Sequence, residues 1–411
     1  MFKVVLWDYT SESAQWTKKF LKSDGVEIIR TLRPDDPDQA DVIMRGDWNF
    51  VLIFENGQRE LFNEIFKTMR EMNVSTNNIV FAKDFNSMLN NPAAVHALMK
   101  PEVCDQLYRH WNFFNHRRWH HYISASTGGF HYVGTSADDY IIQPMYLESA
   151  DFSIFEIEFF YNMVKKYYSV DDSGGGIFLD LGANIGTTGI YFCKKLTPNL
   201  KCIAFEPDAE NFKLLRVNTI LNDVEDKMTL VNCGLGENFD TMTMYISLFN
   251  PGANSVVEFY GDSFGEVFKQ KYSKNQGGRP TETVKIIPLD AYLAENKIAA
   301  EEIKYIWVDT EGFEAATLLG AKNLLMKNPA PVFMEFNPTA WNKSGCFDRF
   351  VALLKTVGYS HFVWDFDEAR HRKEILRPID SLFAWKNSEM GFGGKKGYGG
   401  NIFLIRAGAV N

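Results

Sequence analysis

A glycine-rich turn after a short apolar run constrains this chain most strongly. Residues 176–189 read Gly-Ile-Phe-Leu-Asp-Leu-Gly-Ala-Asn-Ile-Gly-Thr-Thr-Gly. The apolar run at 177–179 is typical of a central parallel strand that is covered on both faces. Gly182 and Gly186 lack the Cβ atom that would keep a ligand away from the backbone, and the threonines that follow can begin a helix. The stretch therefore predicts a strand, a ligand-binding turn and a helix.

Two acidic residues lie at the ends of this predicted strand and the next one. Asp180 comes two residues before Gly182, and Glu206 ends the apolar run 202–205. In nucleotide-binding α/β folds, a carboxylate after the second strand accepts hydrogen bonds from ribose hydroxyls. Each acid alone could be a surface residue or a helix cap, but together with the glycines they favour a nucleoside site.

The turn also indicates which nucleoside fits. A dinucleotide fingerprint has G-x-G-x-x-G, whereas this chain has Gly-Ala-Asn-Ile-Gly at 182–186, and no Gly-Lys-Ser or Gly-Lys-Thr of a P-loop follows. Asp180 would repel a pyrophosphate, but it suits a cationic ligand rich in hydrogen-bond donors, such as S-adenosylmethionine. Cys233, after the third predicted strand, could meet the adenine or simply be a core residue. We expect the following residues to hold the cofactor: Asp180, Gly182, Ala183, Asn184, Gly186, Glu206, Pro207 and Cys233.

A second cluster of polar residues follows two later predicted strands. Asp309 and Glu311 follow one apolar run, and Glu335 and Asn337 lie at the end of another. The carboxyl ends of parallel strands meet at one edge of a sheet, so we expect Asp309 and Glu335 to face each other across a substrate cleft. Asp309, Glu311 and Glu335 are the candidate catalytic residues.

Two interpretations of this cluster remain open. In one, Asp309, Glu335 and Asn337 bind Mg²⁺ or another divalent cation that acidifies a substrate hydroxyl. In the other, Asp309 or Glu335 is a general base or merely holds substrate hydroxyls. Helix capping and pairing with cations are the structural alternative to both.

The length of 411 residues predicts two or three domains. Strand and helix patterns alternate over residues 1–100, which indicates a small α/β accessory domain for recognition or dimerisation, and thus a possible homo-oligomer. Residues 101–150 read as a helical and loop connector that could cover the substrate. From 151 to 411 the alternation predicts a second α/β domain, with a β-rich insertion at about 239–285.

Composition excludes some classes of protein. The net charge of −9 argues against broad nucleic-acid binding, and no apolar run approaches the ~20 residues that span a bilayer. We therefore expect a cytoplasmic protein that acts on a small or neutral substrate. The five cysteines are scattered without C-x-x-C spacing, which favours neither a disulfide framework nor a zinc site.

Taken in order, these motifs resemble the FkbM family of S-adenosylmethionine-dependent methyltransferases. The resemblance covers about residues 176–405 and rests on the segments 180–186, 205–207, 286–290, 308–314 and 318–321, together with Glu335. The family usually carries a lysine two residues before the aspartate of its Asp-x-Glu-Gly motif, but this chain has Trp307 there. The acceptor could therefore differ from that of other family members.

The resemblance implies a class I, Rossmann-like methyltransferase fold with a seven-stranded, mainly parallel sheet, here preceded by the smaller α/β domain. It also implies O-methylation of a hydroxyl, often on a sugar or a secondary metabolite, with S-adenosylmethionine as methyl donor. A non-catalytic nucleoside-binding or scaffold protein that retains the fold is the alternative.

Overall fold

The computed structural model describes residues 2–8, 26–33, 36–38, 41–42, 50–54, 79–81, 120–136, 138, 140–170, 173–247, 250–257, 280–365, 374–386 and 400–409. The chain divides into two compact units, residues 1–119 and 120–411. The division falls inside the segment 101–150 that the sequence predicts as a connector. Residues 101–119 of that segment, and 258–279 of the predicted insertion, lie outside the described residues.

The first unit contains a four-stranded parallel sheet with the order β2-β1-β3-β4. Its strands are β1 (Phe2–Asp8), β2 (Val26–Leu32), β3 (Phe50–Phe54) and β4 (Ile79–Phe81). In β1, one of the two inner strands, Val5 and Leu6 are fully buried. Buried apolar runs of this kind are typical of strands in a parallel sheet.

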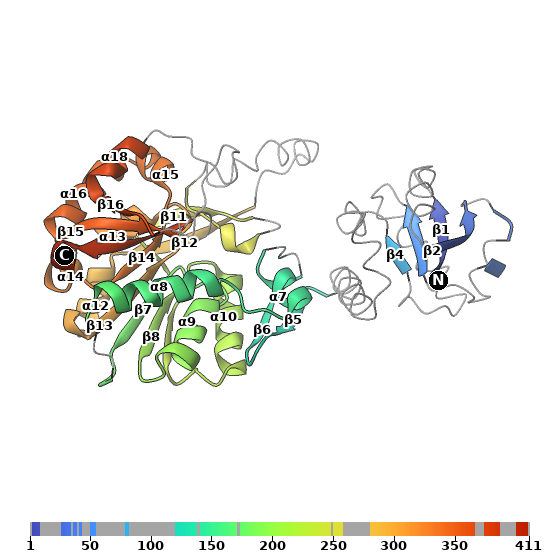
Figure 1. Ribbon diagram of the computed structural model, residues 1–411, viewed down its shortest axis with the longest axis horizontal. Helices are drawn as coiled ribbons and strands as arrows, with labels where there is room; N and C mark the ends of the chain where they lie inside the picture. Colours follow the sequence, from blue (N-terminus) through green and yellow to red (C-terminus); the bar gives the residue numbers. More distant parts are fainter. Residues whose placement is uncertain are drawn as a thin grey trace. The chain divides into compact units, whose positions relative to one another are not determined.

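The second unit is built on an eight-stranded sheet with the order β16-β15-β17-β14-β13-β7-β8-β9 (Figure 1). The strands β9, β8, β7, β13 and β14 are mutually parallel, while β17 runs antiparallel to β14 and β15. The sheet is therefore mixed and has one strand more than the seven expected. The additional strand is β16, three residues at the edge that pair antiparallel with β15.

The bounds of these strands follow the apolar runs of the sequence. They are β7 (Ile177–Leu181), β8 (Lys201–Phe205), β9 (Met228–Val231), β13 (Ile303–Val308), β14 (Val332–Glu335), β15 (Tyr359–Trp364), β16 (Leu376–Pro378) and β17 (Asn401–Arg406). All five residues of β7 are buried, as expected for a central strand.

Helices cover both faces of the sheet, and side chains alternate between them. On one face, Phe160 of α8 (Ile154–Tyr167) packs against Tyr305 and Trp307 of β13 and Phe333 of β14. On the other, Ile306 and Val308 join the cluster that includes α13 and α16. The remaining helices are α9 (Thr187–Tyr191), α10 (Ala209–Leu221), α12 (Leu289–Glu295), α13 (Glu314–Leu319), α14 (Lys322–Lys327), α15 (Pro338–Lys343), α16 (Phe347–Thr356) and α18 (Leu382–Trp385), with a π-helical turn at Phe192–Leu196.

Two small β structures flank the main sheet. The hairpin of β5 (Tyr122–Ser126) and β6 (His131–Thr135) leads into α7 (Ile142–Glu148). A three-stranded sheet joins β10 (Gly234–Leu235), β12 (Thr281–Ile287) and β11 (Asp240–Tyr245), with β11 antiparallel to β12. No helix among the described residues is both long and apolar enough to cross a membrane.

Candidate active site

A cavity of about 240 Å³ lies at the carboxyl ends of β7, β8 and β13. Eight of the predicted site residues line it: Gly182, Ala183, Asn184, Glu206, Pro207, Cys233, Asp309 and Glu311. Asp180, Gly186, Glu335 and Asn337 lie outside its lining. The cavity thus brings most of both predicted clusters together at one edge of the sheet.

The glycine turn is packed directly against the end of β13. Gly182 has a φ of 98°, and a Cβ atom on it would lie 1.8 Å from the backbone oxygen of Asp309. The N–H groups of Gly182 and Ala183 both donate to the carbonyl of Phe205, at 3.0 and 2.8 Å. Any side chain at position 182 would therefore push the β7 turn away from β13.

Glu206 holds the glycine turn through its backbone. One carboxylate oxygen accepts from the N–H of Asn184 and the other from the N–H of Asp208, both at 2.8 Å. Burial raises the pKa of Glu206 to about 8. Since each carboxylate oxygen can accept a second hydrogen bond, Glu206 can fix the turn and still bind a ligand hydroxyl in the cavity that it lines.

Asp180 lies beneath the turn and 1% of it is exposed. Its Oδ2 accepts from the N–H of Gly189, at 3.0 Å, in the first turns of α9. Burial raises the pKa of Asp180 to about 7, and the charge of Asp309 adds to this effect. Because Asp180 does not line the cavity, its position suits support of the helix start more than direct contact with a ligand.

Two amide oxygens in the cavity lining have no hydrogen-bond partner within the described chain. They are Oδ1 of Asn184 and Oδ1 of Asn211, both buried. The Nδ2 of Asn211 donates to the carbonyl of Pro251, at 3.0 Å, and so fixes a second cavity wall formed by residues 250–254. Buried acceptors without a partner are costly in a protein alone, which suits a ligand that donates hydrogen bonds here.

Asp309 directly follows β13 and also lines the cavity. Burial raises its pKa to about 7, and the negative charges of Glu314 and Glu156 raise it further. An acid with a pKa near neutrality is suited to accept a proton at physiological pH. Trp307 lies two residues earlier, within β13, and lines the cavity as well. Its ring packs at 4.4 Å against Phe333, with a tilt of 43° between the two rings.

The loop after Asp309 is fixed from behind by Glu314. This fully buried carboxylate accepts from the N–H groups of Thr310 and Gly312, at 3.2 and 2.7 Å, and from Nε1 of Trp341, at 2.8 Å. Between the two backbone donors, Glu311 adopts a left-handed φ of 52°, which is strained for a residue with a side chain. Ser255 adds a hydrogen bond to the carbonyl of Glu311, at 2.6 Å.

Glu335 and Asn337 have other roles than the predicted cation site. The Oδ1 of Asn337 accepts from the N–H of Ala340, at 3.0 Å, and caps α15. The side chain of Glu335 forms a hydrogen bond with Glu314. No group of three or more His, Cys, Asp or Glu side chains in the described ranges is placed to hold a metal ion. The prediction of a divalent cation at Asp309, Glu335 and Asn337 therefore has no support in the structure.

Several cavity residues could not be found from the motifs. Tyr140, Ile141, Phe152 and Ser153 come from the segment before the glycine turn, where the sequence offered only a general expectation of a substrate cover. Asn211 did carry a local signal, since Asp208 three residues earlier caps α10 through the N–H of Asn211, at 2.6 Å. That signal places the helix start but does not show that Asn211 faces a cavity.

Comparison with known proteins agrees with this architecture. The sequence profile of the Methyltransferase FkbM domain matches residues 180–365. The chain carries an FkbM-type methyltransferase domain. The match begins at the acid under the glycine turn and includes the cavity acids Glu206, Asp309 and Glu311.

One curated relative and two solved structures illustrate the similarity of this chain to other proteins. Methyltransferase sdnD of Sordaria araneosa is 28% identical over 207 residues, which are 48% of this chain and 75% of the relative. The match to the crystal structure of methyltransferase FkbM from Methylobacillus flagellatus covers 98% of this chain and 90% of the other chain, with 12% identity and a TM-score of 0.33. The match to the structure of P. horikoshii TYW2 in complex with MeSAdo covers 69% of this chain and 70% of the TYW2 chain, with 14% identity and a TM-score of 0.30.

Proposed function

We propose that this chain is an S-adenosylmethionine-dependent O-methyltransferase that acts on a hydroxyl of a small molecule or glycan. One observation supports this most strongly: hydrogen-bond acceptors converge on one cavity from the ends of neighbouring strands. Glu206 and the amide oxygens of Asn184 and Asn211 lie in one half, and Asp309 with Glu311 in the other. A ligand with hydroxyl groups and positive charge matches this set of acceptors.

The residues of the first half fit an adenosyl cofactor. Glu206 would hold the ribose hydroxyls, and the unpartnered oxygens of Asn184 and Asn211 would accept from the cofactor's donors. Gly182 lines this half, where its missing Cβ makes room for the carbonyl of Asp309, and Cys233 lies at the third strand end. Burial raises the pKa of the Cys233 thiol to about 11, so Cys233 acts there as a small apolar residue and not as a nucleophile.

The second half is suited to activate an acceptor hydroxyl. S-adenosylmethionine, when bound, supplies a methyl group that is activated by a sulfonium. Asp309 accepts the proton that the acceptor oxygen loses, and its raised pKa matches that task near neutral pH. Trp307 and Phe313 give this half aromatic walls, which align the acceptor and exclude water.

Titration with S-adenosylhomocysteine by calorimetry tests the cofactor assignment. We expect wild-type protein to bind it, and absence of binding would refute the proposal. Methyl transfer from labelled S-adenosylmethionine to a panel of glycosides and phenols then tests catalysis. Binding without transfer to any acceptor would favour the alternative of a non-catalytic nucleoside-binding protein.

Substitution of Asp309 tests the general base. Asp309→Asn keeps the shape but cannot accept a proton, so we expect the turnover rate to fall about 100-fold or more while S-adenosylhomocysteine binding changes little. The reaction should proceed in EDTA. Loss of activity in EDTA that Mg²⁺ restores would instead favour the cation hypothesis.

A further inference from the structure

Helix α10 joins the edge of β6 through two asparagine side chains. Asn218 and Asn222 lie one turn apart and are fully buried. The carboxamide of Asn218 accepts from the N–H of Val133, at 2.7 Å, and donates to its carbonyl, at 3.0 Å. Asn222 makes the same pair with His131, at 3.0 and 2.7 Å. The two carboxamides thus satisfy the edge of β6 as a neighbouring strand would.

The second N–H of each carboxamide distinguishes the two residues. That of Asn218 donates to the carbonyl of Ile185, at 2.9 Å, between Asn184 and Gly186 in the glycine turn. That of Asn222 donates to the carbonyl of Asn218 within α10, at 2.8 Å. Asn218 therefore contacts both β6 and the glycine turn, whereas Asn222 contacts β6 and its own helix.

The chain after β6 forms part of the cavity wall. Asp138 accepts from the N–H groups of Tyr140 and Ile141 through Oδ1, at 2.9 and 2.8 Å, and both of these residues line the cavity. The N–H of Asp138 in turn donates to the carbonyl of Thr135, the last residue of β6, at 3.1 Å. The position of β6 thus sets the position of this wall.

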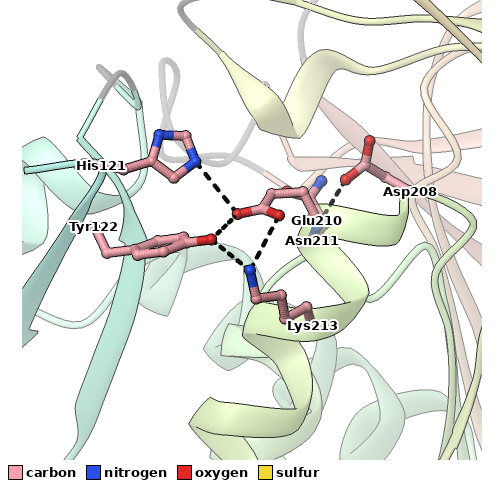
Figure 2. A network of polar contacts seen from close by, with 6 residues as sticks. All are labelled: His121, Tyr122, Asp208, Glu210, Asn211 and Lys213. Carbon is pink, nitrogen blue, oxygen red and sulfur yellow. Dashed lines mark hydrogen bonds and ion pairs between the residues drawn. The ribbon is translucent and has the colours of Figure 1, made fainter.

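A separate, exposed network attaches β5 to the start of α10 (Figure 2). The hydroxyl of Tyr122 donates to Glu210, at 2.5 Å, and accepts from Lys213, at 2.6 Å. His121 lies 3.4 Å from the same carboxylate. This network fixes the hairpin to α10 without contact to the glycine turn, so it offers a control for the role of Asn218.

We propose that Asn218 is a positioning residue for cofactor binding: one carboxamide holds the Ile185 carbonyl and the β6 edge together, and so couples the wall at 138–141 to the glycine turn. The inference rests on the proposed cofactor site. It extends that site to β6 and to Tyr140 and Ile141, which precede the part of the chain that matches the FkbM profile.

Two matched substitutions test this coupling. Asn218→Asp and Asn222→Asp each keep the acceptor oxygen, and each replaces two N–H donations with a carboxylate oxygen. We expect both to lower the melting temperature, since each disturbs the same strand edge. We expect the dissociation constant for S-adenosylhomocysteine to rise at least about 10-fold in Asn218→Asp, but to stay within about 2-fold of wild type in Asn222→Asp and in Tyr122→Phe.

The outcomes separate this inference from the proposed function. Wild-type protein that does not bind S-adenosylhomocysteine overturns both. Wild-type binding with equal losses of affinity in the two asparagine variants, or no loss in either, overturns the role of Asn218 alone.

Hydrogen exchange on wild-type protein gives a second test that depends on no variant. Although His131 and Val133 do not line the cavity, we expect S-adenosylhomocysteine to slow the exchange of amides in β6. Unchanged exchange in β6 on binding overturns the coupling even if Asn218→Asp fails to fold.

Discussion

In both halves of the cavity a buried glutamate accepts two backbone N–H groups, from two different loops in one half and from a single loop in the other. In the cofactor half, Glu206 accepts from Asn184 and Asp208, and Asn184 has a φ of 50°. In the acceptor half, Glu314 accepts from the two neighbours of Glu311, whose φ is 52°. In each half, a carboxylate stabilises a loop that includes a strained residue.

The difference between the halves lies in what each glutamate faces. Glu206 lines the cavity and can also bind a ligand, whereas Glu314 lies behind its loop and binds Trp341 and Glu335. In the proposed cofactor half, one side chain thus both supports a loop and faces the cavity. In the proposed acceptor half, Glu314 supports the loop and Asp309 faces the cavity.

The largest expected effect comes from Glu206→Ala. The change removes a ligand contact and leaves two buried N–H groups without their acceptor, so we expect affinity for S-adenosylhomocysteine to fall about 100-fold. Calorimetry measures it, with the exposed Glu225→Ala as control. Undiminished affinity would show that Glu206 binds no cofactor. Glu206 and Glu314 would then both serve only as supports for loops.

A smaller and different effect is expected from Glu314→Gln. Glutamine keeps only one acceptor oxygen, so its NH2 group must face either the two loop N–H groups or Nε1 of Trp341. We therefore expect the turnover rate to fall about 30-fold, with the KM for S-adenosylmethionine changed less than about 3-fold. Trp341→Phe removes one donor only and should cost less. If Glu314→Gln weakens cofactor binding as much as Glu206→Ala does, the two halves are not separate.

The pH dependence of stability sharpens the comparison. Asp180, Glu206 and Asp309 have pKa values raised to about 7, 8 and 7 from ordinary values near 4. Their folded forms hold protons more tightly than the unfolded chain does. Their stabilising contribution is therefore complete below about pH 4 and is lost as the pH rises through 7 to 8.

We accordingly expect the melting temperature without ligand to fall as the pH rises from about 4 to about 8, with a loss of stability on the order of 1 kcal/mol per pH unit for each group. Asp309→Asn removes one of the three titrating groups, so the melting temperature of this variant should depend less steeply on pH. A profile that rises with pH, or one that the substitution leaves unchanged, would contradict the assignment.

The smallest effect is expected from Glu335→Gln. Two carboxylates that share a hydrogen bond hold one proton between them, and Glu335 as the donor to Glu314 can be replaced by an amide N–H. We expect turnover to stay within about 3-fold of wild type. A loss of turnover of about 100-fold would indicate instead that Glu335 acts as a catalytic base and does not merely support Glu314.

Sequence patterns predicted the parts of the fold that depend on local chemistry. The apolar runs located β7, β8 and β13, and the turn after Asp180 marked the strand end where the cavity lies. The edge strand β16 was missed because three residues carry too little periodicity.

The site was less accessible to prediction where it depends on tertiary contacts. No local pattern shows that Asn218 reaches Ile185, or that Trp341 donates to a glutamate 27 residues earlier. Asp180 illustrates the opposite case, since a motif marked an acid that the fold then places under the cavity and not in its lining.

The close packing of Gly182 on the carbonyl of Asp309 has a consequence for protein engineering. A Cβ atom at position 182 would meet main-chain atoms of Asp309, so no rearrangement of the cavity side chains could make room for it. A library aimed at new acceptors should keep position 182 invariant and randomise Tyr140, Phe152 and Trp307. Diversity introduced at the glycine would instead abolish the geometry on which every library member depends.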